Sequence, residues 1–389
     1  MIIDNNPNTK FLTFNPKIWI QYQTGTPAVI TRYTITSAND APNRDPKDWT
    51  LEESNDGKKW TTLDRRTNQN FDQRFQKREF TFINSNGYTH HRLTVNNHKD
   101  HILQIAEFEL IGTGGRGKAI PPETWVEHWF EHNQTLKRVF YDDDVAVYHD
   151  SQVDSRVTWM NKYMGDVWRY TKRIYGDFGD DERLYVVMHT GKYSGGHPST
   201  SFDASHDYRN MIDCGPGPWL TSNYGDLSIP THEVSHIVEL GSKNSHGSPA
   251  FGIWGDSKWA EIYNYDVYKG LNRPEAAQRW HDECSATRDN FPRENTFWFR
   301  DWFYPIYSQF GGTQLLNSYF NILSQNFPKS GNGVDYERGM NMGEFVHFWS
   351  GAAGKNLKQQ ATKAFGWPSD YEKQFQQARK DFSGVTYSN

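Results

Sequence analysis

The sequence predicts two domains of different fold class, an all-β sandwich at the amino terminus and a mainly α-helical domain with a small β-sheet after it. Residues 1–112 contain short β-branched or aromatic segments separated by turn clusters. From residue 123 onward, apolar residues recur at helical spacing instead. The length of 389 residues agrees with this division, because a domain usually holds roughly 100–200 residues.

The composition narrows the classes of function. Aromatic residues make up 15% of the chain and supply large buried areas, although only 35% of the residues are hydrophobic. The formal net charge is -5 and no run of five like charges occurs, which disfavours a nucleic-acid interface or a polybasic membrane patch. No apolar stretch approaches the roughly 18 residues of a membrane-spanning helix. We therefore expect a folded protein without a nucleic-acid partner or a transmembrane segment.

Short strands with turn residues between them predict the amino-terminal sandwich. The predicted strands are 19–22, 29–36, 49–53, 78–82, 91–95 and 105–111. Clusters such as Asn55-Asp56-Gly57 separate them, and many short strands with such turns are typical of a β-sandwich. A Gly-rich segment at 112–115 and the pair Pro121-Pro122 then predict a linker. The expected organisation is a sandwich at 1–113, a linker at 114–124 and a second domain at 125–389.

Helical periodicity dominates the second domain. Helices are predicted at 155–175, 229–240, 259–268, 313–326, 342–351 and 357–365. A single strand is predicted at 184–188, and this strand or the segment 209–213 could hold an extended peptide by edge pairing. The segment 195–202, with the sequence GGHPSTSF, is predicted as a mobile loop of a cleft. No other substrate-binding residue is assigned.

The pentapeptide His232-Glu233-Val234-Ser235-His236 predicts a zinc site. Positions i and i+4 of a helix share one face, so both imidazoles can reach one ion. Glu233 lies about 100° around the helix from His232, where it can contact a water molecule as a catalytic base without being a ligand. Pro230 before this motif and Gly241 after it suit the start and the end of a helix.

A catalytic zinc ion needs a third protein ligand and one open position. The candidates are Glu239, His246, Asp256 and Glu261. Glu261 lies in the strongly patterned helix 258–266, whereas 246–256 is rich in Gly and Ser and shows no rigid element. We therefore predict Glu261 as the third zinc ligand. Tyr265 and Asp266 are predicted as hydrogen-bonding partners of an imidazole, although a core tyrosine and a surface aspartate are equally compatible with the pattern.

The segment HEVSH followed by WAEIYNYD resembles the gluzincin metallopeptidases, in which a Glu on a following helix is the third zinc ligand. The metzincin pattern does not fit, because positions 239 and 242 hold Glu239 and Ser242. The most similar subgroups are the basic-secretory-protein peptidases and the enhancin-like mucin peptidases. The resemblance covers roughly 157–382 and implies a hydrolase that cleaves peptide bonds with Zn²⁺.

Residues 1–113 resemble the discoidin family, also called coagulation factor five/eight C-type, which includes many bacterial carbohydrate-binding modules. The residues that carry the resemblance are 4–11, 36–40, 44–49, 54–57 and 104–110. This resemblance implies a jelly-roll sandwich, a carbohydrate ligand and a structural Ca²⁺ ion. Asp4, Thr9 and Glu107, with nearby carbonyl groups, would supply the oxygen ligands that Ca²⁺ prefers.

Together these features predict a secreted zinc metallopeptidase that acts on glycoproteins and is directed to them by its carbohydrate-binding domain. The alternative is a non-catalytic glycan-binding or adhesion protein with an inactive peptidase-like domain, against which the intact Glu233 argues. No signal-peptide pattern begins the sequence, so a secreted, periplasmic or cell-surface location would require a signal outside it. Cys214 and Cys284 either form a disulfide or are two buried thiols.

Overall fold

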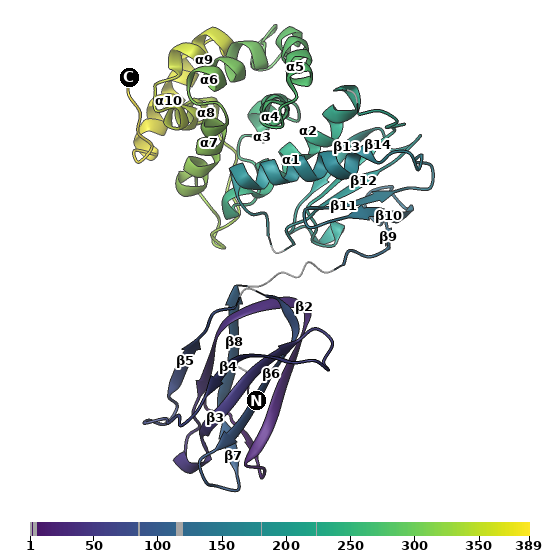
Figure 1. Ribbon diagram of the computed structural model, residues 1–389. Coiled ribbons are helices and arrows are strands. Elements are labelled where there is room, and N and C mark those ends of the chain that lie inside the picture. Colours follow the sequence, from purple (N-terminus) through teal and green to yellow (C-terminus); the bar gives the residue numbers. More distant parts are fainter. Residues whose placement is uncertain (1, 3–5, 85, 114–119, 180, 223) are drawn as a thin grey trace. The chain divides into compact units, whose positions relative to one another are not determined.

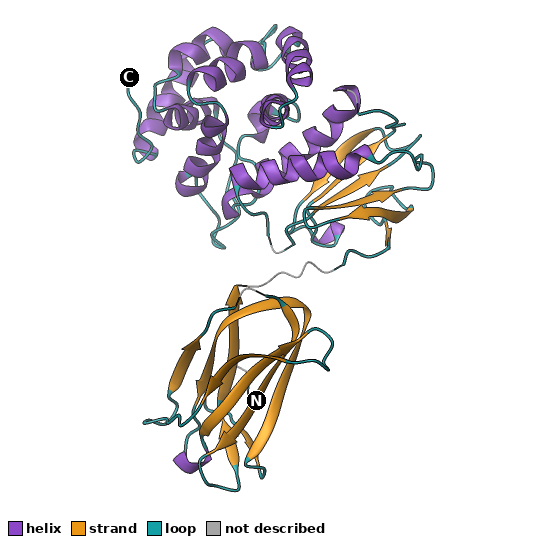
Figure 2. Ribbon diagram, viewed as in Figure 1, coloured by secondary structure: helices purple, strands orange, loops and turns teal. Residues whose placement is uncertain are grey.

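The computed structural model describes residues 2, 6–84, 86–113, 120–179, 181–222 and 224–389 (Figure 1). The chain forms two compact units, Met1–Ile120 and Pro121–Asn389. The first is built of strands and the second mainly of helices (Figure 2), which agrees with the two periodicities of the sequence. Of the predicted linker 114–124, residues 114–119 lie outside the described residues.

The first unit is an antiparallel β-sandwich. Its strands are β1 (Phe11–Thr13), β2 (Lys17–Thr36), β3 (Pro46–Ser54), β4 (Thr61–Arg66), β5 (Lys77–Thr81), β6 (Tyr88–Asn97), β7 (Leu103–Ile105) and β8 (Glu107–Thr113). The long strand β2 joins two layers, because residues 17–23 pair with β6 whereas residues 29–36 pair with β8. Inward-facing side chains such as Tyr33, Trp49 and Phe108 form a core of this unit's own residues.

The second unit contains a mixed six-stranded sheet. Its strands are β9 (Thr124–Val126), β10 (Thr135–Tyr141), β11 (Val145–His149), β12 (Leu184–Met188), β13 (Gly195–Ser199) and β14 (Met211–Gly215). They are arranged in the order β13-β14-β12-β11-β10-β9, with β11, β12 and β14 parallel. The predicted strand 184–188 is confirmed as β12, although the sheet is larger than the sequence predicts.

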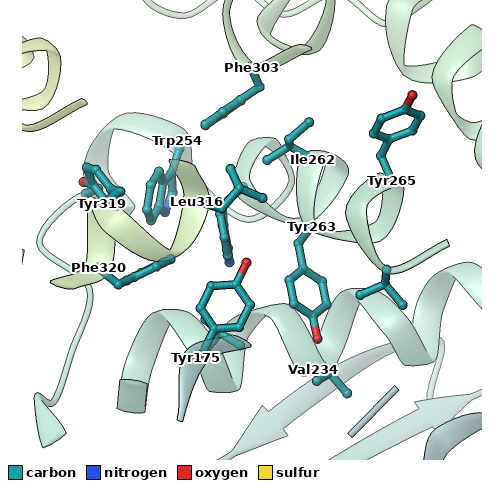
Figure 3. Packing of buried hydrophobic residues seen from close by; sticks show 14 of the residues in the cluster. Tyr175, Val234, Trp254, Ile262, Tyr263, Tyr265, Phe303, Leu316, Tyr319 and Phe320 are labelled. Atoms are coloured by element: carbon teal, nitrogen blue, oxygen red, sulfur yellow. The ribbon is translucent and has the colours of Figure 1, made fainter. Parts of the chain in front are cut away.

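Helices make up the rest of the second unit. Their bounds are α1 (Trp159–Tyr175), α2 (Tyr224–Gly241), α3 (Phe251–Trp254), α4 (Lys258–Gly270), α5 (Pro274–Ala286), α6 (Tyr304–Gln309), α7 (Thr313–Asn326), α8 (Met342–Ala353), α9 (Lys358–Phe365) and α10 (Ser369–Asp381). α1 and α2 pack against the sheet, and α4 packs against α2. Figure 3 shows part of the resulting core, in which Val234 of α2 and Tyr263 of α4 belong to one hydrophobic cluster.

The two faces of this sheet support different cores. Val147 and Cys214 belong to the large cluster shared with the helices. The alternate residues Tyr148 and Val187 belong to a smaller cluster with Trp125 on the opposite face. Alternate residues along a strand therefore face either the helices or the smaller cluster around Trp125.

Candidate metal centre

Helix α2 presents the pentapeptide as the sequence predicts. Val234, Ile237 and Val238 are buried in the core, which fixes the helix against the sheet. This orientation leaves His232 and His236 on one face, with their Nε2 atoms 3.1 Å apart. Two imidazole nitrogens at this distance can share one ion.

Asp256 completes a cluster with these histidines. Its Oδ1 atom lies 3.3 Å from His236 Nε2, and its Oδ2 atom lies 3.6 Å from His232 Nε2. Ligand atoms about 2.0–2.2 Å from a tetrahedral ion lie roughly 3.3–3.6 Å from one another, so this geometry fits three ligands of one zinc ion. Gly255, with φ of 58°, ends α3 and places Asp256 beside α2. The Asp256 side chain is 73% exposed, so the fourth side of the cluster is open to water.

The structure does not bring Glu261 to the histidines, so its prediction as the third ligand is replaced by Asp256. The phase of α4 explains the difference. Trp259 faces α2 and donates its Nε1–H to the carbonyl of Ser235 at 2.9 Å. Glu261 follows two positions later, about 200° around the helix, and therefore points elsewhere. Burial raises the pKa of its carboxyl to about 8, and nearby Lys258 opposes this increase.

The two predicted imidazole partners also have other roles. Asp266 accepts hydrogen bonds from the hydroxyls of Tyr170, Tyr307 and Thr313, at 2.8, 2.7 and 2.5 Å. Tyr265 packs edge-to-face against the rings of neighbouring aromatic residues, including Tyr307. Both residues therefore stabilise the packing of α4, and neither contacts His232 or His236 among the contacts of the described residues.

Glu239 is the residue that orients His236. Its Oε2 atom lies 2.9 Å from His236 Nδ1, so the Nε2 atom of the ring faces the cluster. Its Oε1 atom accepts hydrogen bonds from Trp254 Nε1, at 2.7 Å, and from the Ser248 hydroxyl. The i, i+3 spacing of His236 and Glu239 on a helix is the sequence signal for this role. His246, another candidate ligand, instead lies 3.0 Å from Asp335.

Glu233 is adjacent to His232 in the helix, and its side chain is buried. Its burial raises the pKa of the carboxyl to about 7, while the two histidines act in the opposite direction. Strand β13 comes close to it, because a Cβ atom added at Gly196 would lie 2.6 Å from Glu233 Oε1. Only glycine leaves the room that this carboxylate occupies. Glu233 is therefore held between α2 and β13.

The strand next to Glu233 is not one of the two segments predicted to hold a peptide. β12 lies between β11 and β14, and β14 lies between β12 and β13, so both are interior strands. The end strand of the sheet is β13, which occupies most of the segment predicted as a mobile loop. Its antiparallel pairing with β14 runs from Gly195 to Ser199.

The predicted calcium ligands are described only in part. Asp4 lies outside the described residues. Thr9 donates its hydroxyl to the carbonyl of Asn6 at 3.0 Å, and Glu107 Oε1 accepts the Asn6 amide at 3.0 Å. Thr9 and Glu107 thus contact the same turn. The two cysteines, Cys214 and Cys284, are both buried and free, so they are not paired.

Comparisons with known proteins identify the amino-terminal domain. Residues 1–108 match the sequence profile of the F5/8 type C domain, which confirms the predicted discoidin-type domain there. Among solved structures, CpGH89CBM32-5 from Clostridium perfringens, in complex with GalNAc-β-1,3-galactose, is 20% identical and has a TM-score of 0.23, with 28% of this chain and 81% of that chain covered. An F5/8 type C domain from Bacteroides fragilis is 17% identical with a TM-score of 0.25, and the match covers 28% of this chain and 76% of that chain.

A curated relative shares a shorter segment. The peptide-N(4)-(N-acetyl-β-glucosaminyl)asparagine amidase of Arabidopsis thaliana is 49% identical over 65 residues, which is 16% of this chain. The match spans only 9% of that relative's length. None of the helices in the described parts of the chain has the length and apolar composition needed to cross a membrane.

Proposed function

We propose that residues 121–389 form a zinc-dependent peptidase domain, and that the F5/8 type C domain directs it to glycoproteins by binding carbohydrate. The observation that carries this proposal is the convergence of His232, His236 and Asp256 beside Glu233. Three protein ligands with one open side are typical of catalytic zinc sites, whereas structural sites usually have four protein ligands. The HExxH motif itself supports peptide-bond hydrolysis, although an aspartate here takes the place of the glutamate that is the third ligand in gluzincins.

In the proposed hydrolysis, the zinc ion, its ligands and Glu233 have different roles. A zinc ion at this site would supply a Lewis acid that polarises the scissile carbonyl and lowers the pKa of a water molecule toward about 7. His232, His236 and Asp256 would hold it, and Glu239 keeps the His236 ring oriented. Glu233 accepts the proton of the attacking water and returns it to the leaving amine. A carboxyl pKa near neutrality suits a group that transfers a proton in both directions.

The position of β13 supports a polypeptide as substrate. It is the last strand in the order of the sheet, and Gly196 brings its backbone against Glu233. An extended peptide that pairs with β13 would gain main-chain hydrogen bonds without requiring a particular sequence. Its backbone would then lie next to the catalytic base. This arrangement favours an endopeptidase that binds extended segments.

The amino-terminal domain supports glycoproteins as the substrate class. The F5/8 type C match covers residues 1–108, and discoidin-like domains include many carbohydrate-binding modules. The partial Arabidopsis relative is named for action on a glycosylated asparagine, which also favours a glycoprotein. We place such an enzyme outside the cell or at a cell surface. We also propose a structural Ca²⁺ ion near Thr9 and Glu107, and an increase of this domain's melting temperature on calcium addition would support it.

The test compares wild-type protein with Glu233→Gln on mucin and on an unglycosylated protein. Glutamine preserves the size of the side chain but cannot accept the water proton, so the rate should fall by about 10²–10⁴-fold. Zinc content should stay equal, because Glu233 is not a ligand. Equal cleavage by both forms would indicate a contaminating protease. If zinc-loaded wild-type protein cleaves no substrate in a broad panel, the non-catalytic glycan-binding alternative replaces the proposal.

A further inference from the structure

A second group of metal-ligating side chains lies on the sheet face away from α2. Cys214 of β14 faces the core shared with the helices, so its neighbour Asp213 projects from the other face. His189 directly follows β12, the parallel neighbour of β14. The connection between β9 and β10 brings Glu127 and His132 to the same place, and all four side chains are buried.

The atoms of this group have the spacing of ligands around one ion. His189 Nε2 lies 2.9 Å from Glu127 Oε1 and 3.1 Å from Asp213 Oδ1. His132 Nδ1 lies 2.9 Å from Asp213 Oδ2 and 3.6 Å from Glu127 Oε1. Three segments distant in the sequence therefore meet at one point with two carboxylates and two imidazoles.

Three of these atoms lack hydrogen-bond partners. Glu127 Oε1, His189 Nε2 and Asp213 Oδ1 are buried and make no hydrogen bond within the described residues. They lie within 3.1 Å of a neighbour in the group, but their orientation does not meet hydrogen-bond geometry. Buried polar atoms almost always have a hydrogen-bond partner, and three that lie close together without hydrogen-bond geometry have the arrangement expected of ligands around one cation.

The other polar atom of each of these three side chains makes a hydrogen bond to a residue outside the trio. Glu127 Oε2, His189 Nδ1 and Asp213 Oδ2 each have a partner that fixes the orientation of the group. The partners are Gln134 N at 2.8 Å, Asp150 Oδ2 at 3.0 Å and Trp129 Nε1 at 3.0 Å. Such outer partners, and a carboxylate behind a histidine in particular, are characteristic of metal ligands.

We infer that Glu127, His189 and Asp213 bind a divalent transition-metal ion, with His132 beside them as a donor of its Nδ1–H to Asp213 Oδ2 at 2.9 Å. Imidazole together with carboxylate favours Zn²⁺ and similar first-row ions over Ca²⁺ and Mg²⁺, which prefer oxygen ligands alone. The two carboxylates balance the charge of such an ion. A cavity of about 230 Å³, lined in part by His132 and Asp213, gives an ion access to the group.

This second site is separate from the proposed zinc centre. His197 pairs with Asp213 and Gly196 pairs with Cys214 across β13 and β14. Adjacent residues on a strand face opposite sides, so the second site lies on one side of these strands and Glu233 on the other. An ion there would join β12 and β14 to the β9–β10 connection. Its role would be to stabilise the sheet beside the catalytic base.

Zinc content of the full chain tests the inference. After removal of metal and reloading with Zn²⁺ alone, wild-type protein should retain two zinc ions per chain. A His232→Ala/His236→Ala variant removes the first centre and should retain one. Adding Glu127→Gln and His189→Gln to this variant should lower the content to none. Circular dichroism on each variant shows whether the chain is folded.

Asp150→Asn is a second, milder variant, because Asp150 contacts His189 but is not a ligand. In the background without the first centre it should weaken zinc binding by about 10–100-fold. The inference is overturned if that background retains no zinc, or if a folded Glu127→Gln/His189→Gln chain keeps its ion. One zinc in both wild type and background supports the second site and contradicts the first. If wild-type protein retains one zinc ion and the His232→Ala/His236→Ala variant retains none, the first centre is supported and the second site is contradicted.

Discussion

At the scale of single residues, Asp256 is distinguished by the direction of its two oxygens. Each lies near a different imidazole, at 3.3 and 3.6 Å, although the side chain is mostly exposed. The nearby charges lower the pKa of its carboxyl, and hydrogen bonds to His232 and His236 are the main cause. The carboxylate form of Asp256, which is the form that can bind a cation, is therefore favoured at this position.

Replacement of Asp256 by asparagine should reduce zinc affinity at the first centre by at least tenfold. The substitution keeps the shape of the side chain but removes the charge that offsets part of the ion's charge. Glu261→Gln is the matched control, since Glu261 lies five positions later and contacts neither histidine among the described residues. Zinc retained against a graded series of chelator concentrations measures the difference. If Glu261→Gln loses zinc while Asp256→Asn keeps it, the assignment reverses.

The ligands differ in how far local sequence could predict them. His232, Glu233 and His236 follow from helix geometry within five positions, so the motif alone predicts their arrangement. The position of the candidate third ligand, Asp256, depends on the turn at Gly255, and the phase of α4, set by a tertiary hydrogen bond from Trp259 to α2, keeps Glu261 away from the histidines. No local pattern contains that information. The same reason explains why Glu127, His189 and Asp213 carry no signal in the sequence.

At the scale of elements, β13 determines access to Glu233. The strand ends the sheet and contacts α2, and Gly196 is the residue that allows this close approach. The sequence GGHPS suggests a loop because glycine and proline are typical of turns. Both residue types are accepted in an end strand, where Pro198 needs no partner for its missing N–H. Composition alone could therefore not distinguish this strand from a loop.

Gly196→Ala should lower the rate of peptide hydrolysis by about 10–100-fold while leaving zinc content unchanged. The added Cβ would lie 2.6 Å from Glu233 Oε1, so the carboxylate must move, and a displacement of about 1 Å can cost this much in rate. Gly252→Ala is a suitable control, because an added Cβ there meets nothing within 4 Å. Steady-state rates on a short peptide measure both variants. A wild-type rate for Gly196→Ala would show that Glu233 does not act from this position.

Other elements show the same division between local and tertiary information. β12 was predictable because its five residues are all buried and apolar. α10 was missed because only Phe375 and Ala378 are buried along it, which leaves a weak apolar period. β4 was missed because its sequence, TTLDRR, is largely polar and pairs at the end of a sheet. Burial alone is not sufficient, because β11 and β14 are also fully buried and are not among the strands predicted from the sequence.

At the scale of the whole molecule, the two units have separate cores. The core around Tyr33, Trp49 and Phe108 contains only residues of the first unit. The metal-ligating groups identified among the described residues all belong to the second unit. The two hydrophobic clusters of the second unit likewise contain residues of that unit alone, so each unit has a core built from its own part of the described chain. If the proposed function is correct, carbohydrate binding by the first domain raises the local concentration of substrate at the second.

Separation of the domains should therefore affect glycoproteins and not short peptides. A fragment of residues 121–389 should hold zinc and cleave an unglycosylated peptide at the rate of the full chain. On mucin below saturation it should be slower by about tenfold or more, because it lacks the tethering that multiplies affinity. A fragment of residues 1–113 should bind the glycan in isolation and compete with the full chain for mucin. Equal rates of the full chain and the 121–389 fragment on mucin would show that the F5/8 type C domain does not direct the peptidase, and would leave its carbohydrate ligand without a part in the reaction.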